Sequence, residues 1–206
     1  MKIEATREAF FPDMLKNLPI WVLWRLEERN GNKTKVPYQV NGRKASSTNP
    51  GQWTTYEEAS ATLARYPDHY SGLGTVMAKK NGLIFIDIDH CLDADGNTNH
   101  CADDILDAFT DDDGGLTQYI ELSQSGTGLH IIAIGDIPRS FKNSKKHVEM
   151  YSDGRFCAMT GRAISAREPS ECDIGIRYVF EKYKTKSAED VPPQRVDPQI
   201  VKSDRW

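Results

Sequence analysis

The stretch Leu83-Ile-Phe-Ile-Asp-Ile-Asp89 decides how the rest of the sequence is interpreted. Its apolar, β-favouring residues predict a buried strand. Side chains alternate along a strand, so Asp87 and Asp89 share one face, with Cα atoms about 6.6 Å apart. Two carboxylates at the end of a buried strand are costly to desolvate unless a cation lies between them, and Mg²⁺ or Mn²⁺ suits oxygen ligands. The alternative is a pair of solvated acids.

The sequence on both sides of this stretch predicts many short strands and few helices. Strands are predicted at 20–26, 33–40, 73–78, 117–122, 128–134, 147–151 and 155–160, and helices at 55–65, 101–110 and 173–184. The last two strands are expected to pair as a hairpin across Ser152-Asp153-Gly154. Hairpins with a few helices indicate an α+β fold rather than a doubly wound sheet.

A loop rich in hydroxyls and glycines precedes the strand that starts near His130. Its residues are Ser123, Ser125, Gly126, Thr127 and Gly128. Such a loop can present hydroxyls and backbone N–H groups to phosphate oxygens, and the imidazole of His130 could contact the same triphosphate. The loop fits neither a dinucleotide-binding fingerprint nor a P-loop. The alternative is a hairpin loop followed by a structural histidine.

The predicted strand at 147–151 carries a third acid. Glu149 shares its strand face with His147 and Tyr151, and an inward-facing Glu149 would supply a third metal ligand. The alternative is an exposed strand glutamate. The interpretation as a metal site requires Glu149 to lie on the same side of the sheet as Asp87 and Asp89.

Between His130 and Glu149 lies a basic segment with no acid, residues 139–147. Its cations are Arg139, Lys142, Lys145 and Lys146. With Phe141 available for stacking, the segment is a candidate contact for single-stranded nucleic acid. The alternative is a solvated lysine loop.

Composition excludes some classes of protein. The 206 residues carry 26 basic and 30 acidic side chains, a net charge of −4, which excludes coating of DNA by bulk positive charge. No apolar run approaches the roughly 20 residues of a membrane span, so no membrane partner is expected. The four cysteines form no CxxC pair, which favours reduced thiols in a cytoplasm. A zinc site from His90, Cys91, His100 and Cys101 matches no standard spacing but stays open.

Taken in order, these motifs resemble the primase-polymerase domain of the archaeo-eukaryotic primase superfamily. The resemblance is to the bifunctional type found on phages, plasmids and integrated elements, and it covers about residues 15–165. It rests on strand-Asp-x-Asp, then Ser-x-Ser-Gly-x-Gly-x-His, then a strand acid followed by Arg155-Phe156 and Thr160-Gly161. Lys35-Val-Pro-Tyr38, the segment 47–53 and Glu121 before the hydroxyl loop also match.

The resemblance implies a fold and a domain organisation. We expect a primase-polymerase catalytic domain at 1–184, in which an RRM-like antiparallel sheet at about 71–184 is packed against an N-terminal α/β unit at about 1–70. Residues 185–206, with Pro192 and Pro193, are expected to be a polar linker or disordered tail. In many relatives such a tail leads to a helicase.

The resemblance also implies an activity and its site. It implies template-directed nucleotidyl transfer, as a DNA primase, a DNA polymerase or both, with two Mg²⁺ or Mn²⁺ ions and a nucleoside triphosphate substrate. By position, the catalytic metal ligands are Asp87, Asp89 and Glu149. His130 and the adjoining hydroxyl loop match the triphosphate contacts, and Arg155 and Lys35 match phosphate or template contacts.

The partners expected from the resemblance are a single-stranded DNA template with its primer, dNTP or NTP, and a helicase domain or protein, in a cytoplasm. Two alternatives stay open. The first is a non-catalytic nucleic-acid-binding module for replication initiation. The second is a nucleotide-sugar glycosyltransferase, whose Asp-x-Asp also holds a metal, but this leaves His130 and Glu149 unexplained.

Overall fold

The computed structural model describes residues 1–29 and 31–186, and within them the chain forms two antiparallel sheets. The four-stranded sheet has the order β2 (Asn32–Tyr38), β1 (Trp21–Arg29), β3 (Gly72–Met77) and β9 (Arg155–Ala158). The six-stranded sheet has the order β10 (Ala163–Ala166), β5 (Tyr119–Leu122), β6 (Leu129–Ile134), β4 (Leu83–Ile88), β8 (Val148–Tyr151) and β7 (Phe141–Asn143). The predicted α+β class, with antiparallel sheets and few helices, is confirmed.

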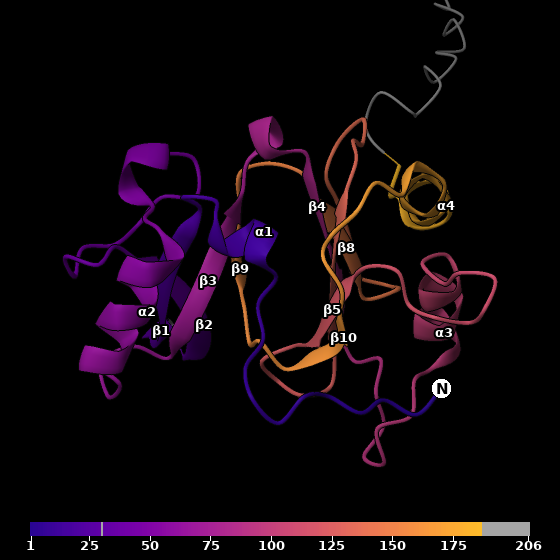
Figure 1. The fold of residues 1–206 in the computed structure, drawn as a ribbon, viewed down its shortest axis with the longest axis horizontal. Helices are drawn as coiled ribbons and strands as arrows, with labels where there is room; N and C mark the ends of the chain where they lie inside the picture. The colour runs from indigo at the N-terminus through magenta and orange to yellow at the C-terminus, as the bar shows by residue number, and fades with distance from the viewer. Residues whose placement is uncertain (30, 187–206) are drawn as a thin grey trace, which may run out of the picture.

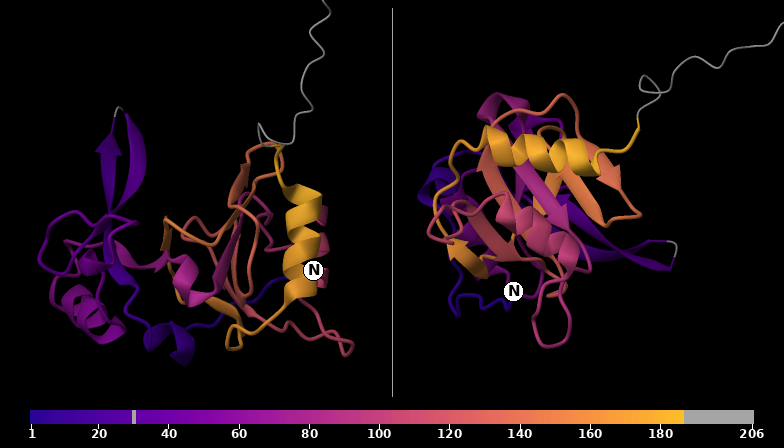
Figure 2. Two further views of the ribbon diagram at one scale, coloured as in Figure 1. Left: turned by 90° about the horizontal axis from the view of Figure 1, so that it is seen from above. Right: turned by 90° about the vertical axis from the view of Figure 1, so that its right-hand side faces the viewer.

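Helices cover the outer faces of both sheets (Figure 1). Helix α2 (Tyr56–Arg65) lies outside the four-stranded sheet, and α3 (His100–Asp107) and α4 (Asp173–Tyr183) lie outside the six-stranded sheet. The remaining helical turns are α1 (Asp13–Lys16), η1 (Pro50–Gln52) and η2 (Lys79–Asn81). Figure 2 shows the β1–β2 hairpin projecting from the body of the molecule. Among the described residues, no helix has the length and apolar character needed to cross a membrane.

Strand β4 supplies both hydrophobic cores because its side chains alternate. Ile84, Ile86 and Ile88 enter the core beneath α3 and α4. Leu83 and Phe85 point the other way, into a second core shared by the two sheets. This second core includes Trp21 and Leu23 of β1, Leu73 and Met77 of β3, and Ile132 of β6. Beyond Phe85 this face of β4 leaves the core, and the next residue on it is Asp87.

The expected hairpin between 147–151 and 155–160 is wrong. Strand β8 pairs with β4 and β7, whereas β9 crosses to the other sheet and pairs with β3. The physical reason is a close approach at Gly74: a Cβ there would lie 2.3 Å from a ring atom of Phe156. Glycine leaves room for this ring, so β9 fits beside β3. Sequence alternation alone does not reveal which sheet a strand joins.

Strands of the four-stranded sheet come from both sides of residue 70, since β1 and β2 precede it and β3 and β9 follow it. The division into units at 1–70 and 71–184 stays a prediction. The polar tail expected at 185–206 lies, apart from residues 185 and 186, outside the described residues.

Candidate active site

Four titratable residues line up across the six-stranded sheet. Glu121 of β5 is directly opposite His130 of β6, His130 is opposite Asp87 of β4, and Asp87 is opposite Glu149 of β8. Lys142 of β7 extends this row beyond Glu149. Residues directly opposite each other in neighbouring strands share a face of the sheet. Glu149 therefore lies on the same face as Asp87, which meets the condition of the sequence interpretation for this pair, while Asp89 lies beyond the end of β4.

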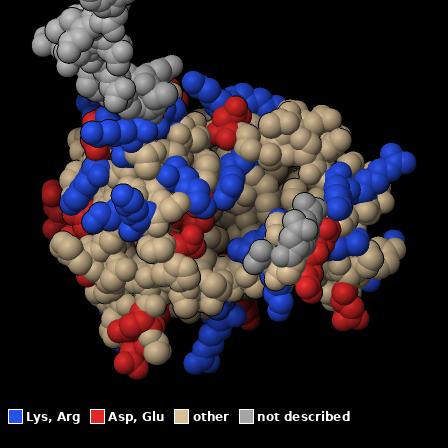
Figure 3. All heavy atoms as spheres, turned by 180° about the vertical axis from the view of Figure 1, so that it is seen from behind, with Lys and Arg blue, Asp and Glu red and all other residues tan. Residues whose placement is uncertain are grey.

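Asp87, His130 and Lys142 of this row line a cleft of about 970 Å³ between the two sheets. Strand β2 and the segment 45–47 form one wall, and the other lining residues lie on or beside β4, β6, β7 and β9. The charged or titratable residues that line it are Lys33, Lys35, Asp87, Asp89, His130, Lys142 and Arg155. Figure 3 shows the molecule from the cleft side, with Lys and Arg side chains gathered around a hollow and acidic side chains at its border. Cations around an acidic pair suit a polyanionic ligand.

His130 is held between two carboxylates. Its Nδ1 lies 2.8 Å from Oε1 of Glu121, and its Nε2 lies 3.8 Å from Oδ1 of Asp87. The ring also contacts Phe85, with 5.0 Å between the ring centroids. Burial lowers the pKa of His130, but the hydrogen bond to Glu121 and the charges of Asp87 and Glu121 outweigh burial and raise this pKa above its ordinary value.

Asp87 is the least satisfied acid of the row. Its Oδ1 is buried and has no hydrogen-bond partner among the described residues. Burial raises the pKa of Asp87 above its ordinary value. The positive charge of His130 opposes this rise, while the nearby Asp89 and Glu149 add to it. A buried carboxylate oxygen without a donor fits a site that would receive a cation.

The negative charge of Glu149 is balanced by neighbouring cations. Its carboxylate is paired with Nζ of Lys142 and accepts hydrogen bonds from the Tyr151 hydroxyl at 2.5 Å and from the Arg155 guanidinium at 3.0 Å. Burial raises the pKa of Glu149, but the hydrogen bonds from Lys142 and Tyr151 and the charge of Arg155 hold it below its ordinary value. Glu149 is thus buried and ion-paired beside the cleft, and it is not one of the residues that line it.

The residues of the hydroxyl loop do not line the cleft in the described part of the chain. Its hydroxyls bind one another: Ser125 Oγ lies 3.0 Å from both Ser123 Oγ and Thr127 Oγ1. The Gly128 N–H donates to Ser123 Oγ, and a Cβ at Gly128 would lie 2.7 Å from the Ile88 carbonyl oxygen. Gly126 has a φ of +78°, which favours glycine. The loop therefore packs closely beside the end of β4.

The predicted basic segment is divided by the fold. Lys142 reaches the cleft, and Lys145 and Lys146 are exposed in the turn between β7 and β8. Arg139 does not line the cleft, and its guanidinium donates to the Thr185 carbonyl at 2.5 Å. Lys35 and Arg155, predicted as phosphate or template contacts, both line the cleft.

The donor set fits divalent cations in part. Within residues 1–29 and 31–186, no three His, Cys, Asp or Glu side chains are grouped closely enough to hold a metal ion. The proposed zinc ligands His90, Cys91, His100 and Cys101 are therefore not grouped as a metal site either. Cys91 is buried, and its thiol donates to the Ile88 carbonyl. Asp87, whose Oδ1 has no hydrogen-bond donor in the described part of the chain, and Asp89 fit as ligands, whereas Lys142 and Arg155 are paired with the carboxylate of Glu149.

Sequence reasoning missed three participants in the site. Lys33 lines the cleft beside Lys35, and their spacing of two along β2 was the available signal. Tyr151 binds Glu149, and the same spacing places them on one face. Glu121 was noted only as a matching residue, and no sequence pattern indicated that it binds His130.

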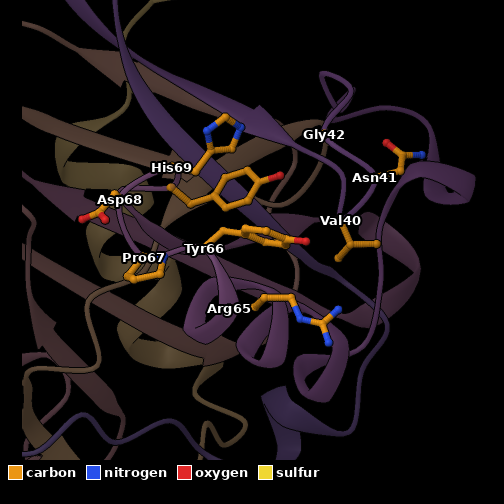
Figure 4. A pocket seen from close by; sticks show the side chains of 9 residues that line it. Val40, Asn41, Gly42, Arg65, Tyr66, Pro67, Asp68 and His69 are labelled. Carbon is orange, nitrogen blue, oxygen red and sulfur yellow. The ribbon is translucent and has the colours of Figure 1, made fainter.

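A second hollow, of about 520 Å³, lies beside α2 and contains none of the predicted residues. It is lined by 40–42 and 65–70. Figure 4 shows the half-exposed ring of Tyr66 directed toward Val40.

The chain is thus an α+β protein whose cleft combines an acidic pair with lysine and arginine side chains. No family model matches the chain. The chain is 36% identical over 178 residues to the DNA primase-polymerase of Nitratiruptor phage NrS-1, a match that covers 82% of this chain. The chain belongs to the primase-polymerase family. It spans about a quarter of the phage protein's length, since the match covers 23% of that protein.

Proposed function

We propose that this chain catalyses template-directed nucleotidyl transfer in the cleft between its two sheets, as a DNA primase, a DNA polymerase or both. The observation that carries the proposal is the row of His130, Asp87 and Glu149 on one face, with an Asp87 oxygen that has no hydrogen-bond partner among the described residues. The family assignment supports it, because the phage relative is named as a primase-polymerase. The proposed setting is replication of a phage, plasmid or integrated element.

The fold proposed within this class is the primase-polymerase fold, with the six-stranded sheet as the RRM-like catalytic part. Support comes from the position of the predicted site, because Asp87, His130 and Glu149 all project from neighbouring strands of that one sheet. The four-stranded sheet then contributes to the cleft through β2 and β9.

Asp87 and Asp89 would hold two Mg²⁺ or Mn²⁺ ions, with Glu149 as the third ligand. When bound, such ions lower the pKa of an attacking hydroxyl and neutralise charge on the phosphates. Lys142 and Arg155 now bind Glu149, and the phosphates of a nucleoside triphosphate would compete for these two cations. This competition would free the Glu149 carboxylate when substrate arrives.

The remaining cleft residues would bind and orient the substrate. The reaction joins a primer or nucleotide 3′-OH to the α-phosphate of an incoming nucleotide and releases pyrophosphate. Catalysis of this step depends mainly on positioning and on charge stabilisation. His130, Lys35 and Arg155, which line the cleft, would contact the phosphates. The hydroxyl loop at 123–128, which packs beside Asp89, would supply further phosphate contacts.

Single-stranded DNA template and primer would lie along the basic side of the cleft. Lys142, Lys145 and Lys146 follow one another around the β7–β8 strands and turn, and Arg139 lies just before β7. Such contacts are electrostatic and independent of base sequence. A helicase domain or protein remains a proposed partner.

Incorporation of labelled nucleotide on single-stranded DNA tests this function directly. The wild type is supplied with Mn²⁺ or Mg²⁺ and each nucleotide type, with and without a primer, and is compared with Asp87→Asn and Asp89→Asn. Asp112→Asn is the matched control, because Asp112 is exposed in a turn outside the cleft. We expect incorporation by the wild type and the control only.

Two results would contradict the proposal. Equal incorporation by Asp87→Asn would remove the metal assignment. Absence of incorporation by the wild type under every condition, with DNA binding intact, would favour the non-catalytic replication-initiation module, which the ion-paired state of Glu149 also fits.

A further inference from the structure

Glu121 is a completely buried carboxylate with a full set of donors. Its side chain is 0% exposed. It accepts hydrogen bonds from the Thr160 N–H (3.0 Å), the Gly161 N–H (2.8 Å), the Tyr119 hydroxyl (2.8 Å) and Nδ1 of His130 (2.8 Å). A buried charge is retained at such cost only where its partners are fixed. The hydrogen-bond network around Glu121 is therefore a fixed part of the protein interior.

The donors tie Glu121 to the connection between the two sheets. Thr160 and Gly161 lie between β9 of the four-stranded sheet and β10 of the six-stranded sheet. Gly161 has a φ of +68°, and a Cβ there would lie 2.9 Å from Ala9 Cβ. This segment cannot shift easily, so it holds the carboxylate of Glu121 in one place.

The fixed carboxylate determines how His130 is oriented. A carboxylate accepts hydrogen bonds, so Nδ1 of His130 carries the hydrogen and donates it to Glu121. Phe85 covers the ring from the side. The ring's other nitrogen, Nε2, is then the edge nearest Asp87 in the cleft. Turning the ring over would place carbon atoms against Glu121 and leave its oxygen without that donor.

We propose that Glu121 is a positioning residue, which binds Nδ1 of His130 so that the Nε2 edge faces the cleft beside Asp87 and contacts the phosphates of the nucleotide. The inference rests on the proposed function for the identity of the ligand. The orientation of the ring can be tested without any activity.

Steady-state kinetics with Glu121→Gln form the first test. A glutamine keeps the shape, but its single carbonyl oxygen cannot serve both the backbone N–H groups and Nδ1. We expect KM for nucleotide to rise about tenfold and kcat to change much less. Tyr119→Phe is the matched control, because it removes another donor to the same carboxylate and leaves the Glu121–His130 contact. Its KM is expected within about twofold of the wild-type value.

A double-mutant comparison separates positioning from general structural support. If Glu121 acts through His130, Glu121→Gln has no further effect on KM in a His130→Ala background. The same KM factor in both backgrounds, or an unchanged KM in Glu121→Gln alone, would overturn the proposal.

Nitrogen-15 NMR of the wild-type histidine side chains gives a readout that needs neither folding of a variant nor activity. We expect the hydrogen of His130 on Nδ1, bonded to a carboxylate. A bare Nδ1 would overturn the proposal even if Glu121→Gln fails to fold. A wild type without nucleotide incorporation but with the expected Nδ1–H would contradict the proposed function while supporting this orientation of the ring.

Discussion

Along β4, Ile84, Ile86 and Ile88 enter a closed core beneath α3 and α4, whereas Phe85 and Asp87 face the cleft between the sheets. Each face also holds a carboxylate that is mostly shielded from solvent. Behind the sheet, Asp104 of α3 accepts hydrogen bonds from Tyr178 (2.6 Å) and Tyr183 (2.7 Å) and is paired with Lys182. In the cleft, one oxygen of Asp87 has no donor among the described residues.

The two carboxylates differ in what their surroundings do to them. Burial raises the pKa of Asp104, but hydrogen bonds from Lys182, Tyr178 and Tyr183 outweigh it and lower the pKa to about 2. Burial raises the pKa of Asp87, and the neighbouring Asp89 and Glu149 add to the rise. A lowered pKa means that folding favours the charged form, and a raised pKa means that folding opposes it. The back of the sheet is arranged for stability, and the cleft face accepts a cost that fits a role in binding cations.

Asp87→Asn is expected to show the largest difference between the two faces of β4, because it should reduce activity without reducing stability. Loss of a charge that would hold the cations is expected to reduce nucleotide incorporation by at least about a hundredfold. Because the charged form of Asp87 is disfavoured by folding, the melting temperature should stay at or above that of the wild type. Incorporation assays and thermal unfolding measure the two effects. A melting temperature several degrees lower would show that Asp87 is a structural residue.

Ile86→Ala, one residue earlier on β4, should give the opposite result. Ile86 is fully buried in the core under the helices, so its truncation is expected to lower the free energy of unfolding by about 2–5 kcal/mol. KM for nucleotide should not change well below the unfolding transition. Urea denaturation and kinetics at low temperature check both statements, and a raised KM with unchanged stability would break the comparison.

Asp104→Asn tests whether the carboxylate behind the sheet stabilises the fold in its charged form. The folded pKa of about 2 lies below the ordinary 3.8, so the contribution of Asp104 to stability is complete above pH 3.8 and is lost as pH falls toward 2. The variant should melt a few degrees lower at neutral pH and show a shallower loss of stability in acid. Calorimetry from pH 2 to pH 7 measures this, and an unchanged acid profile would contradict the prediction.

The smallest effect is expected from the exposed lysines of the β7–β8 turn. If Lys145 and Lys146 contact template phosphates, Lys145→Ala with Lys146→Ala should flatten the dependence of DNA affinity on salt by about 1.4 in logarithmic slope. The control pair, Arg177→Ala with Lys184→Ala, removes two exposed cations at α4, behind the sheet. Equal slopes in both pairs would mean that the turn does not bind the template.

The same comparison shows what the sequence could predict. Alternation along β4 places Asp87 on the face opposite Ile86, whereas the role of Glu149 as the third acid follows only from the family resemblance. Alternation does not encode strand partners, which is why β9 was assigned to a hairpin with β8 rather than to β3. Alternation also does not encode which side chains of different strands contact each other. Lys142 and Arg155 bind Glu149 from two separate strands, and Glu121 binds His130 from the neighbouring strand.

Binding of a non-hydrolysable nucleoside triphosphate in the presence and absence of Mn²⁺, measured by calorimetry, tests the central claim most directly. The wild type and Asp104→Asn should bind the nucleotide with Mn²⁺ and lose that binding when the metal is chelated. Asp87→Asn should not bind it under either condition. Equal Mn²⁺-dependent binding by Asp87→Asn and the wild type would show that the acids of the cleft face do not form the nucleotide and cation site.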